Sequence, residues 1–258
     1  MKKVNILIII LVATLAFSSC QEKHYAVSSI EASRIEMDST WDAKADPQMV
    51  ELVNSYSEEL HKEMNVEIGT AAQTLVKGFP QSLLTNFTTD AMKEYGTELW
   101  GQVDFAVVNN GGLRSTLNKG TITVGDLFEI YSFDNRLVLL ELKGKTVNDF
   151  FGYIAVNGGE GLSSGIELVV RDRKIESLKI GGQPVDEERI YRVATLDFLA
   201  EGNSGMGAFT HAVNYIDSNV TLRDAMIEQV KKTTAANKEV DASLDNRIKV
   251  YPEKSADK

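Results

Sequence analysis

The sequence predicts an α+β fold, and three observations indicate this class. Apolar residues recur at helical spacing in some segments and form short strand-like runs in others. The two kinds of segment are intermingled, and they do not form the regular βαβ units of a doubly wound sheet. A hydrophobic fraction of 43% and an aromatic fraction of 8% over 258 residues are typical of a globular domain with one sizeable core.

Five segments have the residue patterns of helices. The first follows Asp46 and Pro47, an N-cap residue and a proline at the first helical position, and its apolar residues recur from Met49 to Leu60. Gly96 is expected to end the helix that starts at residue 83. The other helices are expected at 83–95, 124–130, 146–156 and 221–232.

Seven apolar runs are expected to be strands. The run 104–109 ends abruptly at two glycines, a turn is expected at 143–145, and Gly181 and Gly182 form a hairpin-type turn. The strands are expected at 66–71, 104–109, 136–142, 165–170, 174–180, 189–195 and 247–251.

The first 20 residues have the pattern of an export signal. Residues 1–3 are short and basic, 6–17 form an apolar run too short to span a bilayer, and two serines precede Cys20. This arrangement resembles a bacterial lipobox, in which Cys20 becomes the lipidated N-terminus. An ordinary signal peptide that ends near a cysteine is the alternative. Cys20 is the only cysteine, so an intramolecular disulfide is excluded.

This pattern predicts a lipoprotein signal peptide at 1–19, a polar tether at 20–45 and one domain at 46–258. We expect an exported bacterial lipoprotein, anchored to a membrane through its lipid and facing the periplasm or the cell surface. Loss of Lys2 and Lys3 with the signal peptide changes the formal net charge from −10 to −12. An acidic chain of this kind disfavours binding to nucleic acid and to anionic lipid.

Four loops carry residues that are unusual for a core. Glycines in 109–114 allow a sharp turn with exposed amide groups, and Arg114 can bind a phosphate or carboxylate with two hydrogen bonds. Phe133 and Phe198, taken singly, are residues more often found in cores than in binding sites. The four loops are 109–114, 132–135, 162–165 and 197–206.

The order of eight short segments changes that judgement. They resemble the C-terminal domain of the periplasmic and ecto 5′-nucleotidases, also known as UDP-sugar hydrolases, over roughly 66–250. The segments are Asn86-Phe-Thr-Thr-Asp-Ala-Met92, Asp104-Phe-Ala-Val-Val-Asn-Asn-Gly-Gly-Leu-Arg114, Gly120-Thr-Ile-Thr123, Phe133-Asp-Asn135, Leu142-Lys-Gly-Lys145, Gly165-Ile166, Tyr191-Arg-Val193 and Phe198-Leu-Ala-Glu-Gly202.

The resemblance implies a substrate-specificity domain with an α+β fold in four α/β/β/α layers and mixed sheets. It implies that a nucleobase stacks between Phe133 and Phe198 and that Arg114 reaches the phosphate. The remaining positions that match the family's substrate-binding motifs are Asn109, Gly112, Asn135 and Gly165, with Ser204 in the ribose-binding loop.

Three departures from the family pattern bear on the pocket. Pro80 or Gln81 stands near the place of a phosphate-binding arginine, so one phosphate contact is expected to be missing. Ser204 replaces the aspartate that binds the ribose, and a hydroxyl cannot give the charge-assisted bond of a carboxylate. Asn110 replaces the first glycine of the family's N-G-G-G motif.

The family's catalytic domain holds two metal ions in histidine- and aspartate-containing motifs, and this chain lacks those motifs. Its three histidines, His24, His61 and His211, stand in other contexts. We therefore expect no catalytic residue, no metal site and no cofactor in this chain. The divalent metals are expected in a partner phosphatase domain, and the chain alone should not hydrolyse nucleotides.

Three functions remain open at this point. The chain is the substrate-recognition half of a split 5′-nucleotidase, a hydrolase of nucleotide catabolism that works with a separately encoded metallophosphatase subunit. Alternatively it is a stand-alone lipoprotein that binds a nucleotide or nucleoside, or an adaptor with a degenerate pocket. A neighbouring gene for a metallophosphatase without its own C-terminal domain favours the first.

Overall fold

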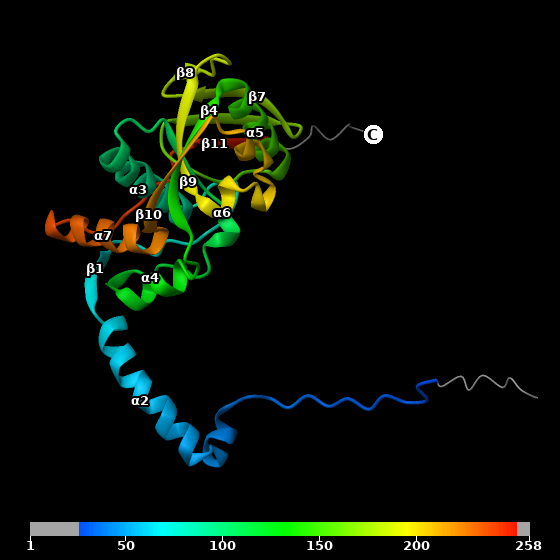
Figure 1. Cartoon of the computed structure of the whole chain (residues 1–258), viewed down its shortest axis with the longest axis vertical. Coiled ribbons are helices and arrows are strands. Elements are labelled where there is room, and N and C mark those ends of the chain that lie inside the picture. Colours follow the sequence, from blue (N-terminus) through cyan, green and yellow to red (C-terminus); the bar gives the residue numbers. More distant parts are fainter. Residues whose placement is uncertain (1–25, 252–258) are drawn as a thin grey trace, which may run out of the picture. The chain divides into compact units, whose positions relative to one another are not determined.

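A computed structural model describes residues 26–251 of the chain (Figure 1). The chain divides into two units, Met1–Leu52 and Val53–Lys258. The predicted signal peptide and Cys20 lie outside the described residues. In the first unit, residues from 26 onward are exposed and contain the 3-10 turn η1 (Ser39–Lys44), capped by the Asp38 side chain. The described part of the predicted tether, 26–45, therefore contains no strand.

The helix predicted after Asp46 forms as α2 (Pro47–Met64). The Asp46 carboxylate accepts a hydrogen bond from the Gln48 N–H at 2.8 Å, as an N-cap residue does. None of the residues of α2 is buried. Among residues 26–251, no helix is both long and apolar enough to cross a membrane.

The second unit is built around a five-stranded mixed sheet with the strand order β10-β4-β9-β2-β5. β2 and β9 are parallel, whereas β4 runs antiparallel to β9 and β5 runs antiparallel to β2. Most residues of the three central strands are buried, which explains why their sequences are nearly continuous apolar runs. The strands are β10 (Asn214–Thr221), β4 (Arg136–Lys143), β9 (Ile190–Leu196), β2 (Phe105–Val108) and β5 (Gly161–Leu162).

The remaining strands of the described residues form two smaller sheets. The four-stranded sheet has the order β11-β6-β7-β8, and Gly181 and Gly182 form the predicted turn between β7 and β8. β1 and β3 form an antiparallel pair. The strands are β11 (Ile248–Tyr251), β6 (Ile166–Arg171), β7 (Lys174–Ile180), β8 (Gln183–Pro184), β1 (Glu67–Ala71) and β3 (Gly120–Thr123).

Helices cover the large sheet and join it to the small one. α3 (Leu83–Trp100) contacts β2 and β5 and lies beside α7 (Leu222–Ala235), while α7 also contacts β1 and α4 (Val124–Ile130). α5 (Gly144–Asn157) contacts β4 and β9 and also β7 of the four-stranded sheet. The buried apolar residues form one continuous core. The predicted α+β class with mixed sheets is confirmed.

Two of the differences from the predicted boundaries lie at glycines. α3 continues past Gly96, which is buried and so closely packed that a Cβ there would lie 3.2 Å from the Trp100 ring. The helix ends at Gly101, where φ is +79°. The predicted turn at 143–145 is instead the start of α5. Its Gly144 lies so close to Asp186 that a Cβ would be 1.9 Å from the carbonyl oxygen.

Candidate functional site

Chain segments that carry most of the predicted site residues meet at one edge of the five-stranded sheet. β2 and β9 are adjacent and parallel, so their carboxyl ends share this edge. β4 is adjacent and antiparallel to β9, so its first residue lies at the same edge. The residues after β2, after β9 and before β4 are therefore neighbours in space. They include Asn109, Phe198 and Phe133, in that order.

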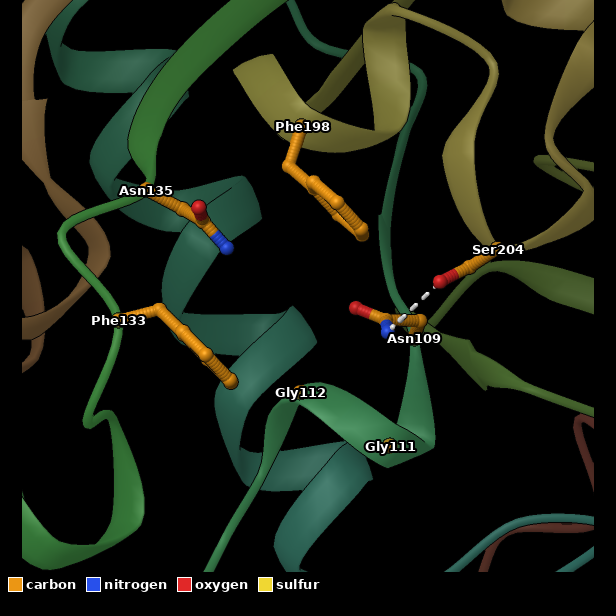
Figure 2. Close-up of a pocket in the computed structure, with 7 residues that line it drawn as sticks. All are labelled: Asn109, Gly111, Gly112, Phe133, Asn135, Phe198 and Ser204. Atoms are coloured by element: carbon orange, nitrogen blue, oxygen red, sulfur yellow. Dashed lines mark hydrogen bonds between the residues drawn. The ribbon is translucent and has the colours of Figure 1, made fainter. Parts of the chain in front are cut away.

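These segments enclose a pocket with a cavity volume of about 280 Å³. This volume lies near the lower end of the range for small-molecule sites. Six of the eight predicted substrate-binding residues line it, and Gly111 is the seventh residue of the lining. The six are Asn109, Gly112, Phe133, Asn135, Phe198 and Ser204 (Figure 2).

The two phenylalanines form the sides of the pocket. Phe133 lies in the loop between α4 and β4, and Phe198 lies in α6 (Asp197–Ala200), the short helix that follows β9. Their exposed fractions are 50% and 39%, so neither is a core residue. Figure 2 shows both rings edge-on with the pocket between them, and the Asn135 side chain extends into that space. An aromatic ring pair with an open gap is suited to hold a flat ligand by stacking.

The glycine turn after β2 forms the third side. Asn110–Gly112 is a 3-10 turn, η2, and the Gly112 N–H donates to the Asn109 carbonyl at 3.0 Å. A Cβ on Gly112 would lie 2.8 Å from Asn109 Oδ1, so the asparagine amide rests against a position that only glycine can occupy. Asn109 Oδ1 is buried, has no hydrogen-bond partner and points toward the pocket (Figure 2). It is an acceptor ready for a ligand donor.

The Ser204 loop forms the remaining side. Asn109 Nδ2 donates to Ser204 Oγ at 3.2 Å, which joins the glycine turn to the turn η3 (Asn203–Gly205). Ser204 has a φ of +54°, an uncommon conformation for serine. The Tyr153 hydroxyl donates to the Ser204 carbonyl at 2.8 Å and holds the loop on α5. Tyr153 is a supporting residue that carries no recognisable sequence signal.

An ion pair and a hydrogen bond join the two phenylalanine segments. The Asp197 carboxylate accepts a hydrogen bond from the Arg136 N–H at 3.1 Å and pairs with the Arg136 guanidinium at 3.3 Å. Arg136 follows Asn135, and Asp197 precedes Phe198. The Asn203 side chain also donates to the Phe198 carbonyl at 2.9 Å. The gap between the rings is therefore set by contacts within the protein.

Arg114 lies at the rim and does not line the pocket. Its guanidinium lies 5.9 Å from the centroid of the Phe133 ring and donates to the Gly111 carbonyl at 3.3 Å. Lys77, whose ammonium donates to the Leu113 carbonyl at 2.7 Å, adds a second cation beside the turn. The arginine is exposed, so it can bind an anionic group of a ligand held between the rings.

Gly165 is not brought to this pocket. It lies before β6, and a Cβ there would be 3.4 Å from the Lys93 ammonium, which donates to the adjoining Ser164 carbonyl. Burial lowers the pKa of Lys93. Pro80, where the resemblance implies a missing arginine, packs against Gly159; a Cβ on that glycine would lie 2.3 Å from the Pro80 carbonyl oxygen.

The sequence gives no signal for Glu160, a buried carboxylate next to the pocket. Its Oε2 accepts a hydrogen bond from the Asn110 N–H at 2.6 Å. Burial raises the pKa of Glu160, and the hydrogen bonds from the Asn110 and Gly161 N–H groups lower it in part. In the part of the chain that the structure describes, no group of three or more His, Cys, Asp or Glu side chains is arranged to hold a metal ion.

Comparison with known proteins extends over most of the second unit. Residues 67–211 match the family described as 5′-nucleotidase, C-terminal domain. Protein UshA of Yersinia enterocolitica is 25% identical over 202 residues, which are 75% of this chain and 36% of that protein. The trifunctional nucleotide phosphoesterase protein YfkN of Bacillus subtilis is 32% identical over 181 residues, which are 64% of this chain and 12% of that protein.

Among solved structures, the 5′-nucleotidase precursor from Thermus thermophilus matches with a TM-score of 0.67 and 26% identity. The match covers 78% of this chain and 42% of that one. The NAD nucleotidase of Haemophilus influenzae, at 19% identity and a TM-score of 0.60, has the same fold. The chain thus spans less than half the length of these relatives.

Proposed function

The chain belongs to the family of 5′-nucleotidase C-terminal domains, and on that premise we propose that its pocket binds a nucleotide or nucleoside. The observation that carries the proposal is the pair of half-exposed rings, Phe133 and Phe198, on two sides of one pocket. A base held between them gains stacking energy on both faces, roughly 1–3 kcal/mol for each ring.

Polar groups at the pocket give the ligand an orientation. Asn109 Oδ1 accepts a hydrogen bond from a donor on the base or sugar, and so satisfies an acceptor that is buried without a partner. A base between the rings leaves its phosphate near Arg114, because the guanidinium lies against the Phe133 ring. Ser204 contributes a neutral hydroxyl in place of the family's aspartate. Its hydrogen bond to the sugar is therefore weaker than the charge-assisted bond that a carboxylate gives.

The second part of the proposal concerns a partner. The chain acts as the substrate-recognition domain of a split 5′-nucleotidase and docks with a separately encoded metallophosphatase subunit that supplies the divalent metals. Support comes from the lengths of the relatives. The match covers 36% of Protein UshA and 35% of the 5′-nucleotidase of Vibrio vulnificus, so most of each relative has no matched counterpart here.

Calorimetric titration of the purified chain with a panel of nucleotides and nucleosides tests the first part. We expect saturable binding of at least one nucleoside monophosphate. No heat of binding from any member of the panel would leave the adaptor with a degenerate pocket as the better account. Repeating the titration with a candidate phosphatase subunit tests the second part, because docking should change the affinity or give a binding heat of its own.

The split arrangement also predicts no phosphatase activity for this chain alone. We expect the homogeneous mature chain to release no phosphate from nucleotides in Mn²⁺ or Zn²⁺, because a metal pair must be held by several ligands to activate water. The measurement is phosphate release from AMP. Robust turnover would refute the need for a partner subunit.

Membrane anchoring through Cys20 is part of the same proposal. Cys20→Ser should leave the protein without lipid and move it from the membrane fraction to the supernatant, because cleavage of the signal peptide removes the N-terminal apolar run. Fractionation of cells that express either form measures this. If the serine variant stays with membranes as the parent does, the lipobox interpretation is wrong.

A further inference from the structure

Glu160 is a buried carboxylate that adjoins the pocket without lining it. It lies between α5 and β5, its exposed fraction is 8%, and its Oε2 accepts the Asn110 N–H at 2.6 Å. A hydrogen bond from a backbone N–H to an ionised carboxylate is roughly twice as strong as one between neutral groups. Glu160 therefore binds the first residue of the glycine turn η2.

The two glycines on either side of Glu160 are closely packed against other segments of the chain. Gly159 has a φ of +129° and packs on Pro80, where a Cβ would lie 2.3 Å from the carbonyl oxygen. Gly161 pairs with Val108 across the β2–β5 ladder, and a Cβ there would lie 2.6 Å from Val108 Cγ1. Both neighbours of Glu160 thus lie in close contact with other segments of the chain, which holds the carboxylate beside the turn.

The turn η2 links Glu160 to residues that line the pocket. Asn110 is flanked by Asn109 and Gly111, and both line the cavity together with Gly112. The Gly112 N–H donates to the Asn109 carbonyl, so one turn of chain holds all of these residues. A shift of the Asn110 backbone therefore moves Asn109 Oδ1, the buried acceptor that points toward the ligand space (Figure 2).

The energetics indicate that Glu160 is not placed there for stability. Burial raises its pKa, and only the two N–H groups of Asn110 and Gly161 oppose this effect of burial. An ionised carboxylate whose burial is offset only by two N–H groups destabilises the fold, and an apolar side chain would avoid that loss. An apolar side chain would, however, leave the Asn110 N–H without its acceptor.

We propose that Glu160 is a positioning residue for the pocket, which fixes the turn 109–112 so that Asn109 meets the ligand in one orientation. The inference rests on the proposed function of the pocket for its effect on affinity. Glu160 does not touch the ligand; it acts through the Asn110 N–H.

Two substitutions separate the roles of the acceptor and the charge. Glu160→Gln keeps a side-chain oxygen for the Asn110 N–H and removes the charge, whereas Glu160→Ala removes the acceptor. Asp104→Ala is a matched control at the opposite end of β2. The Asp104 side chain is 8% exposed, and its carboxylate accepts the Arg192 N–H at 2.8 Å, far along the strand from the pocket.

The experiment is titration of each variant with AMP, combined with hydrogen exchange at the Asn110 amide measured by NMR. We expect Glu160→Ala to weaken AMP binding about tenfold, the size expected for one lost buried hydrogen bond, and to speed exchange at Asn110. Glu160→Gln should stay within about threefold of the parent in both measurements. Asp104→Ala should lower the melting temperature yet leave AMP affinity and Asn110 exchange unchanged.

Two results would overturn the inference. In the first, a folded Glu160→Ala variant binds AMP and protects Asn110 as the parent does. In the second, Glu160→Gln loses as much as Glu160→Ala, which would mean that the acceptor is not what matters. If the parent binds no nucleotide, the proposed function fails. The Asn110 exchange rate and the side-chain amide resonances of Asn109 still decide whether Glu160 fixes the turn.

Discussion

Six phenylalanines of the described residues form two groups with opposite surroundings. Phe105, Phe150, Phe151 and Phe209 are fully buried, and their ring centroids lie 4.8 to 6.3 Å apart in one cluster. Phe133 and Phe198 are half exposed and lie on two sides of a pocket. The same side chain therefore stabilises the core in one group and leaves a surface open for stacking in the other.

The two groups of phenylalanines also differ in their sequence neighbours. Phe105 begins an apolar strand, and Phe150 and Phe151 lie on a helix whose other buried residues include Val147 and Ile154. Phe133 has Ser132 and Asp134 beside it, and Phe198 precedes a glycine-rich loop. An aromatic among turn-forming residues next to a strand end is thus the better candidate for ligand contact.

The largest expected effect is on the free energy of unfolding, which should differ between the two groups of phenylalanines. Phe150→Ala should lower the free energy of unfolding by roughly 3–5 kcal/mol, because it opens a cavity among buried rings. Phe133→Ala and Phe198→Ala should each change it by less than about 1 kcal/mol, since exposed side chains contribute little. Urea denaturation measures all three. Equal losses for the two groups would place Phe133 and Phe198 in the core.

Stacking gives the next effect. Phe198→Ala should weaken binding of a nucleoside by roughly 1–3 kcal/mol, while Phe198→Tyr keeps a ring at the same place and should bind nearly as well as the parent. Calorimetry on the parent and both variants measures this. Unchanged affinity in the alanine variant would show that the ring does not contact the base.

Arg114 tests the phosphate end of the pocket. Arg114→Ala should weaken AMP binding by about 1.5–3 kcal/mol and adenosine binding much less, because a charge-assisted hydrogen bond to the phosphate is lost. Arg171→Ala, in β6, is the matched control for net charge, since Arg171 pairs with Glu176. An equal loss for AMP and adenosine in Arg114→Ala would assign the arginine to the base or to the turn.

The smallest effect comes from the charge on Glu160. Its pKa in the folded state lies above the ordinary value of 4.5, so the folded protein holds this proton more tightly than the unfolded chain. The contribution of Glu160 to stability therefore falls as the pH rises from the ordinary value through the raised one. Glu160→Gln should remove this fall and be more stable than the parent at neutral pH. Denaturation between about pH 4 and pH 7 measures the difference, and parallel profiles for the two proteins would contradict it.

Local patterns predicted most of the fold, and long-range contacts account for the rest. α4 has the predicted bounds, and most strands lie within a residue or two of theirs. The strands β3, β5, β8 and β10 were missed. The two residues of β5, Gly161 and Leu162, form a strand only by pairing with β2. β10 was missed because its sequence, Asn214–Thr221, is half polar and joins the sheet at its edge. Such pairing energies are not visible in any single segment.

The site was predicted to a similar extent. The order of short motifs pointed to six residues that the structure places around one pocket. Their roles in binding stay predictions. Gly165 lies outside the pocket, between β5 and β6 and close to Lys93. Glu160 and Tyr153 were missed, since each acts through a backbone group of another loop. A sequence pattern cannot show which distant N–H or carbonyl a side chain will meet.

One measurement tests the central claim most directly, namely that the gap between Phe133 and Phe198 is a ligand site. The parent, Phe133→Ala and Phe198→Ala are melted with and without AMP at about 100 times the dissociation constant of the parent. Binding to the folded state should then stabilise the parent by about 2.7 kcal/mol and raise its melting temperature by several degrees. The account predicts that both variants melt near the parent without AMP and lose most of this rise. A parent that gains nothing from AMP, with both variants melting far below it, would contradict the account.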